Sequence, residues 1–148
     1  MKPRGPWSQA QVDAFLREAR LPIRLACLGQ RGFPVLASLW FLPLEGRLWC
    51  ATQRSASVAR LLERDPRCAF EISPDAPPYR GVRGQASASL HPERGEEILR
   101  KLVSRYLGDS PTPFSRWLLE RADSETAIAL EPRSLLSWDF QERMGAAR

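Results

Sequence analysis

The sequence predicts a small antiparallel β-barrel with helices on its outside. A tight reversal at Gly46 joins two strand-like runs, as in a β-hairpin. Other strand-like runs follow one another without a helix between each pair, which argues against a doubly wound parallel sheet. The chain of 148 residues is long enough for one domain with a proper core, so we expect a single domain over 1–148. A barrel of this size fills with its own side chains, and a ligand would therefore lie on its rim or between subunits.

The first part of the chain is expected to contain a helix and three strands. Ser8 can cap the helix while Gln11 reaches back to it. The expected strands cover 23–29, 35–42 and 47–52. The strand 35–42 is apolar on both faces, so we expect it at the centre of a sheet or barrel and not at an open surface.

The second part is expected to contain a short helix, two strands, two helices and a last strand. The short helix begins near Ala56 and stops at Asp65-Pro66. The strand 80–91 alternates small or apolar residues with polar ones, which indicates that another element approaches its inward face closely. The remaining segments are a strand over 67–73, helices that begin near Pro92 and Thr112, and a last strand over 126–140 that is interrupted at Pro132.

Composition narrows the function classes. No apolar run is long enough to cross a membrane, and the N-terminus lacks an apolar signal segment, so we expect no membrane partner and a cytoplasmic location. The three cysteines are far apart and lie in apolar runs, which favours buried free thiols over disulfides or a metal site. His91 is the only histidine, so neither a metal cluster nor a serine–histidine triad is expected.

The arginine-rich charge pattern has two explanations: a GC-rich genome, or a partner that carries phosphate or carboxylate. The net charge is +5, and twenty of the 22 basic residues are arginines. Guanidinium groups bind phosphate or carboxylate bidentately. Acidic residues lie between the arginines all along the chain, and no basic tail or stripe is present, so we expect no nucleic-acid partner.

The polar elbow between the strand 47–52 and the short helix is the candidate phosphate site. A helix start, hydroxyl groups and guanidinium groups are the donors that hold a phosphate. The elbow supplies them within nine residues, from Thr52, Arg54, Ser55, Ser57 and Arg60. The alternative is that Ser55 only caps the helix and that the arginines are solvated. The sequence contains no G-x-G-x-x-G and no Walker motif.

Three ordered segments, "RLACLGQRGFPVLASLWFLPLEGRLWCAT", "SVARLLERDPRCAFEI" and "PPYRGVRGQASASL", resemble the pyridoxamine 5′-phosphate oxidase-like family of FMN-binding split barrels. The resemblance extends over about 21–140. It implies a split β-barrel that forms a homodimer, with FMN at the subunit interface and its phosphate at the elbow. The ring would lie near Ala37 and Leu39 and near the backbone around Ala51. The partner subunit would contribute Tyr79, Arg80 and Trp138.

One departure from the family pattern concerns the phosphate. Many members carry a lysine and an asparagine where this chain has Val58 and Leu61. The resemblance implies a flavin-dependent oxidoreductase acting on a small-molecule substrate, and no protein acid or base is assigned because the flavin carries the chemistry. Two alternatives remain open: a deazaflavin coenzyme in place of FMN, or a non-catalytic protein that carries flavin, deazaflavin or haem.

Overall fold

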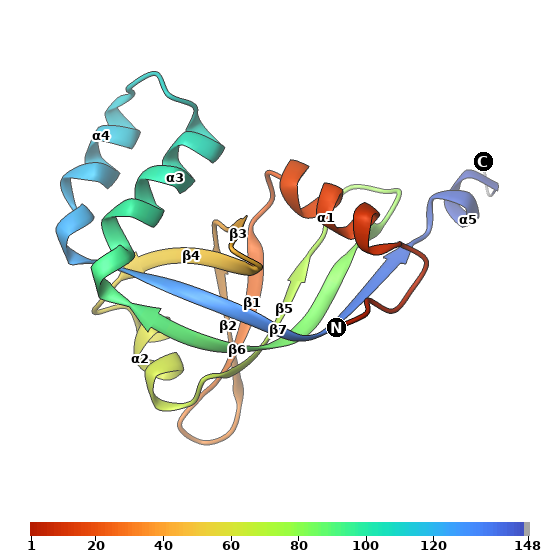
Figure 1. Cartoon of the computed structure of the whole chain (residues 1–148), viewed down its shortest axis with the longest axis horizontal. Helices are drawn as coiled ribbons and strands as arrows, with labels where there is room; N and C mark the ends of the chain where they lie inside the picture. The colour runs from red at the N-terminus through yellow and green to blue at the C-terminus, as the bar shows by residue number, and fades with distance from the viewer. Residues whose placement is uncertain (147–148) are drawn as a thin grey trace.

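Seven strands form one antiparallel sheet in the computed structural model, which describes residues 1–146 (Figure 1). Their order is β2-β1-β5-β6-β7-β4-β3, so β2 and β3 are edges and the hydrogen-bonded ladder stays open. The predicted antiparallel, mainly β fold with flanking helices is confirmed. The strands are β1 (Ile23–Leu28), β2 (Pro34–Leu39), β3 (Leu42–Leu44), β4 (Arg47–Gln53), β5 (Arg67–Ile72), β6 (Arg80–His91) and β7 (Glu125–Asp139).

The helices gather at the two ends of this sheet. Figure 1 shows α3 and α4 together at one end, with α2 near the same end and α1 over the other. The helices are α1 (Gln9–Glu18), α2 (Ser57–Arg64), α3 (Gly95–Leu107), α4 (Pro113–Glu120) and α5 (Gln141–Ala146), with 3₁₀ turns η1 (Pro92–Arg94) and η2 (Ala122–Ser124). The helix α5 was not predicted. None of the helices within 1–146 has both the length and the apolar character needed to cross a membrane.

The predicted capping box of α1 is present. The Gln11 backbone N–H donates to Ser8 Oγ at 3.2 Å, and the Ser8 N–H donates to Gln11 Oε1 at 2.8 Å. The same arrangement starts α4, where Thr112 and Ser115 cap each other. The starts of α1 and α4 therefore lie where the local sequence predicts them.

The strand expected over 35–42 is two strands. β2 ends at Leu39 and pairs with β1, whereas β3 begins at Leu42 and pairs with β4. Between them the Phe41 side chain enters the core, and its N–H donates to the Tyr106 hydroxyl at 3.2 Å. The expectation that both faces would be covered is wrong for this chain alone, because β2 is an edge strand. Its first half is exposed, and Leu36 and Phe33 are each 76% exposed.

β6 and β7 form the long central ladder of the sheet. Their pairing extends from Arg80 opposite Asp139 to His91 opposite Ala127, with a bulge beside Pro132, where Arg133 is the extra residue. Proline is compatible with a strand at such a bulge because its missing N–H is not needed there. At about 3.3 Å per residue the ladder is roughly 35 Å long, so it carries residues to two distant ends of the molecule.

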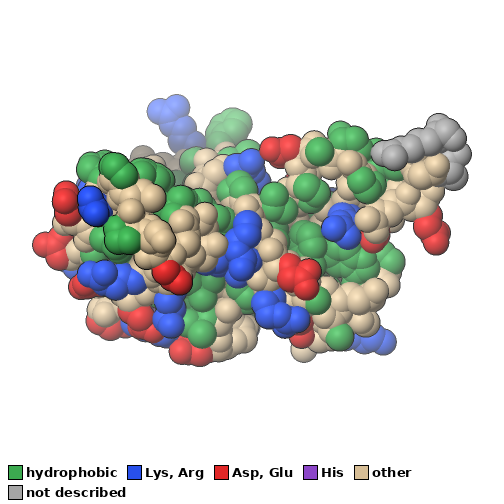
Figure 2. All heavy atoms as spheres, turned by 90° about the horizontal axis from the view of Figure 1, so that it is seen from above, with side chains coloured by type: hydrophobic (Ala, Val, Ile, Leu, Met, Phe, Trp, Pro, Cys, Tyr) green, Lys and Arg blue, Asp and Glu red, His purple; other side chains and the backbone are tan. Residues whose placement is uncertain are grey.

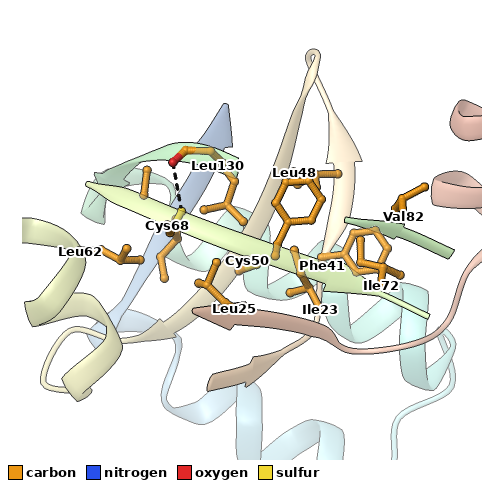
Figure 3. Close-up of a cluster of buried hydrophobic side chains, with 14 of the residues drawn as sticks. Ile23, Leu25, Phe41, Leu48, Cys50, Leu62, Cys68, Ile72, Val82 and Leu130 are labelled. Atoms are coloured by element: carbon orange, nitrogen blue, oxygen red, sulfur yellow. Dashed lines mark hydrogen bonds between the residues drawn. The ribbon is translucent and has the colours of Figure 1, made fainter. Parts of the chain in front are cut away.

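The core lies between the inner face of the sheet and α1 and α2. Its main cluster takes side chains from β1, β4, β5, β6, β7, α1 and α2. Figure 3 shows Cys50 and Cys68 within it, near Leu25 and Leu62. Cys27, Cys50 and Cys68 are buried free thiols, as predicted. Burial raises the pKa of all three, that of Cys68 to about 12, so they are buried side chains and not nucleophiles.

Candidate functional site

A hollow of about 440 Å³ lies beside the elbow between β4 and α2. Its volume is in the range of small-molecule sites. It brings together three residues that the sequence assigned to a cofactor, Leu39, Ala51 and Thr52. The full lining is Pro22, Arg24, Ser38, Leu39, Trp40, Ala51, Thr52, Gln53, Leu99, Leu102, Phe114, Leu118 and Glu125. Ala37 does not line this hollow and packs against the core instead.

The elbow is fixed to the η2 turn by hydrogen bonds. The Arg54 N–H donates to the Ser124 carbonyl at 2.9 Å, and Arg54 Nη2 donates to the Asp123 carbonyl at 2.7 Å. Gln53 Nε2 donates to Glu125 Oε1 at 3.0 Å. Arg54 lines a second hollow, of about 570 Å³, on another side of the elbow. One of its guanidinium N–H groups is thus already used inside the protein.

The start of α2 has no side-chain cap. The helix begins near Ala56, as predicted, but the N-cap residue is Ala56 itself and no side chain bonds the first turn. The alternative in which Ser55 caps the helix is therefore wrong. Ser55, Ser57 and Arg60 are exposed, and no side-chain hydrogen bond of theirs is found among residues 1–146. Uncapped N–H groups, two hydroxyls and a guanidinium at one helix start form an arrangement that suits an anion.

Val58 belongs to the core and not to the site. Its side chain is 7% exposed and packs in the main hydrophobic cluster, with Leu61 partly buried beside it. The inner side of α2 at this position therefore holds an apolar side chain where the resembled family often has a lysine. Any positive charge for a phosphate has to come from Arg54 or Arg60.

Glu125 is a site residue that the sequence reading missed. It opens β7 opposite Gln53, lines the hollow, and is only 6% exposed. Burial raises the pKa of its carboxyl, against the smaller opposing effects of the Gln53 hydrogen bond and the Arg121 charge. A charged residue two positions before the apolar run from Ala127 to Leu130 was the signal available in the sequence.

Two side chains, Trp40 just after β2 and Phe114 in α4, give the hollow an aromatic wall. The Trp40 ring stacks on Tyr106 with 4.9 Å between centroids and 6° between planes. Phe114 meets Trp40 edge-on at 6.4 Å, and Phe114 is 51% exposed. Such a wall offers flat apolar surface to a planar ring.

Tyr79, Arg80 and Trp138 lie at the opposite end of the sheet. Arg80 begins β6, and Trp138 faces Gly81 near the end of β7. The Arg83 guanidinium lies 5.8 Å from the Trp138 ring centre. The elbow, in contrast, pairs with the start of β7. Within a single chain, Tyr79, Arg80 and Trp138 therefore lie far from the hollow.

His91 has partners that the sequence reading did not foresee. Ser89 Oγ and His91 Nε2 are 2.8 Å apart, and His91 Nδ1 lies 3.2 Å from Glu93 Oε1. The Glu93 side chain is 68% exposed, so its carboxylate stays hydrated and orients the ring only weakly. The ring packs against Trp49 at 5.3 Å, which gives His91 a structural role at the end of β6.

The comparisons with known proteins find similar structures. No protein-family model matches the chain, and no curated protein matches it. A conserved hypothetical protein from Mycobacterium tuberculosis superposes with a TM-score of 0.79 and 24% identity, over 98% of this chain and 93% of its own. An F420 reductase gives 0.68 and 21%, over 81% and 92%. A protein from Listeria innocua described as a pyridoxamine 5′-phosphate oxidase gives 0.65 and 17%, over 85% and 94%.

The descriptions of structures with this fold differ in the cofactor that they name. A heme storage protein from Vibrio cholerae also superposes, with a TM-score of 0.67 and 18% identity, over 86% of this chain and 92% of its own. At these identities the likeness establishes the fold. The shared architecture is the one that the resemblance in sequence implied.

Proposed function

We propose that the protein binds FMN at the elbow hollow and acts as a flavin-dependent oxidoreductase on a small molecule. The observation that carries the proposal is the position of Leu39, Ala51 and Thr52 around one hollow next to an uncapped helix start. A bound flavin would supply the acceptor of a hydride or of electrons. The chain's own part is to hold and shield the cofactor.

The residues present fit a phosphate on the outer side of the elbow. The first turn of α2 presents N–H groups that no side chain caps. Ser55, Ser57 and Arg60 surround it on the exposed side, and Arg54 lies on the η2 side. The aromatic wall and Leu39 offer a place for the ring within the hollow.

An absorbance spectrum of the purified protein tests this proposal directly. Flavin bands near stoichiometric occupancy, with reduction by a nicotinamide donor and reoxidation by an electron acceptor faster than for free FMN, are expected. A colourless protein that takes up neither FMN nor a deazaflavin at micromolar concentration would exclude this function.

Arg54→Ala combined with Arg60→Ala is expected to weaken FMN binding roughly 10- to 100-fold, which corresponds to the loss of one hydrogen bond to a charged group, about 1.5–3 kcal/mol, because Arg54 already donates to the Asp123 carbonyl. Riboflavin lacks the phosphate, so its affinity should hardly change. Fluorescence titration of both compounds measures the difference. Arg64→Ala, an exposed arginine in the last turn of α2, is the control. An equal loss for FMN and riboflavin would refute the phosphate assignment.

We propose a homodimer in which each hollow is completed by Tyr79, Arg80 and Trp138 of the other subunit. These residues lie at the far end of a ladder about 35 Å long, so only a second chain can bring them to the elbow. The exposed apolar edge at Phe33, Val35 and Leu36 also requires a cover.

Leu36→Glu should weaken the dimer at least about tenfold, since it places a charge where an apolar contact is proposed. Analytical ultracentrifugation over a range of concentrations measures the dissociation constant. Arg31→Glu, in the exposed turn before β2, serves as the control. A chain that is monomeric before any substitution, or a dimer unaffected by Leu36→Glu, would contradict this arrangement.

A second candidate is a non-catalytic carrier of flavin, deazaflavin or haem. Two observations favour it: Val58 is buried where many family members carry a lysine, and Arg54 already donates to a carbonyl. Both lower the positive charge available to a phosphate. A Soret band would identify haem, and a bound flavin that no donor reduces would identify a carrier.

A further inference from the structure

The carboxyl group of Glu125 is the least satisfied polar group at the hollow. Its Oε1 accepts a hydrogen bond from Gln53, but its Oε2 is buried and has no hydrogen-bond partner within the described chain. Buried polar atoms are nearly always bonded, and leaving one unpaired is costly. An exception next to a ligand-sized hollow requires an explanation.

No cation neutralises this carboxyl within residues 1–146. The ion pairs of the chain do not include Glu125. The charge of Arg121 is felt at Glu125, but that guanidinium lies over the Trp117 ring, 4.5 Å from its centre. A phosphate placed against the carboxylate would be repelled. The group that meets Oε2 must therefore be a hydrogen-bond donor.

The other residues that line the hollow indicate the shape of the ligand that carries this donor. Trp40, Phe114, Leu39 and Leu118 give the wall a flat, apolar character. A planar ring that carries an N–H at its edge would use both features, the wall for its faces and Oε2 for its N–H. A saturated or purely anionic ligand would use neither.

We propose that Glu125 is the specificity-determining residue of the hollow, where its Oε2 accepts a hydrogen bond from a ring N–H of a planar heteroaromatic ligand. This inference rests on the proposed function, and it adds the orientation of the cofactor. The ring lies inside the hollow with its N–H edge at Glu125, and the phosphate lies outside at the start of α2.

Lumiflavin and 3-methyllumiflavin provide the test, because both lack a phosphate and they differ only in whether the ring carries the N3–H. Fluorescence titration is expected to give roughly tenfold or tighter binding of lumiflavin by the unmodified protein, as follows from leaving a buried acceptor unpaired. In Glu125→Gln the atom at Oε2 becomes an N–H donor, since Gln53 donates to the other oxygen. That variant should bind lumiflavin at least about tenfold more weakly and lose the preference.

Glu120→Gln is the matched control, because Glu120 is an exposed carboxyl at the end of α4. It should retain the preference for lumiflavin. Equal binding of the two probes by the unmodified protein would overturn the inference and leave the proposed function standing. Tighter lumiflavin binding by Glu125→Gln would overturn it too, because Oε2 would then be a donor. If neither probe nor FMN binds, the proposed function fails, and the inference fails with it.

Discussion

Gly95→Ala is expected to lower the free energy of unfolding by about 3 kcal/mol, although helix propensity alone favours alanine by about 1 kcal/mol. Gly95 opens α3 and has right-handed helical backbone angles. A Cβ there would lie 2.2 Å from the Glu125 carbonyl oxygen, 2.5 Å from the Glu125 carbonyl carbon and 3.0 Å from the Thr126 nitrogen. These are backbone atoms of β7, so α3 would have to move away from the strand.

Urea unfolding measures the change, and Gly145→Ala is the control. Position 145 is also helical, in α5, but no atom lies within 4 Å of an added Cβ. Its substitution should change stability by less than about 0.5 kcal/mol. Because Gly95 contacts the backbone of Glu125, Gly95→Ala should also weaken flavin binding. Stability of Gly95→Ala equal to or above that of the unmodified protein would contradict the close packing of α3 on β7.

Glu125→Gln is expected to be more stable than the unmodified protein by about 1–2 kcal/mol at pH 7.5, and by little at pH 4. Burial raises the pKa of this carboxyl above its unfolded value, which is about 4.3. A group with a raised pKa contributes stability below the unfolded pKa and loses it as the pH rises through the folded pKa. The amide has no charge to bury, so the variant avoids this loss.

Denaturant unfolding of both proteins at several pH values between 4 and 8 tests this prediction. The difference in stability should grow with pH. Glu120→Gln should follow the unmodified protein at every pH because the carboxyl is exposed. A constant difference would mean that Glu125 is not a strained buried acid. A variant that is more stable yet binds flavin more weakly is the usual trade-off of a functional site.

Local sequence was sufficient for most of the elements. The capping box of α1, the start of α4 at Thr112 and the alternation of β6 depend on neighbours a few residues apart, and the structure contains them as predicted. The bulge beside Pro132 is a place where a strand tolerates a residue without an N–H. These features need no knowledge of the tertiary fold.

Tertiary contacts decided what the sequence could not. The break after Leu39 arises because Phe41 enters the core and the distant Tyr106 bonds its backbone. Ser55 does not cap α2 because the N-cap position falls one residue later, at Ala56. Glu125 is a site residue because the tertiary fold places residues of α3, α4, β2 and β4 around the same hollow. The hydrophobic pattern of β2 indicates that both faces of the strand are covered, but it does not show which part of this chain, or of another chain, covers them.

The length of the β6–β7 ladder has a genetic consequence. Under the proposed dimer, each hollow takes its elbow from one chain and its distal residues from the other. A chain damaged at Arg60 and a chain damaged at Trp138 would each form dimers without an intact hollow. In a mixed dimer both lesions fall in the same hollow, and the second hollow is assembled from two undamaged halves. Two inactive alleles should therefore complement each other when expressed together.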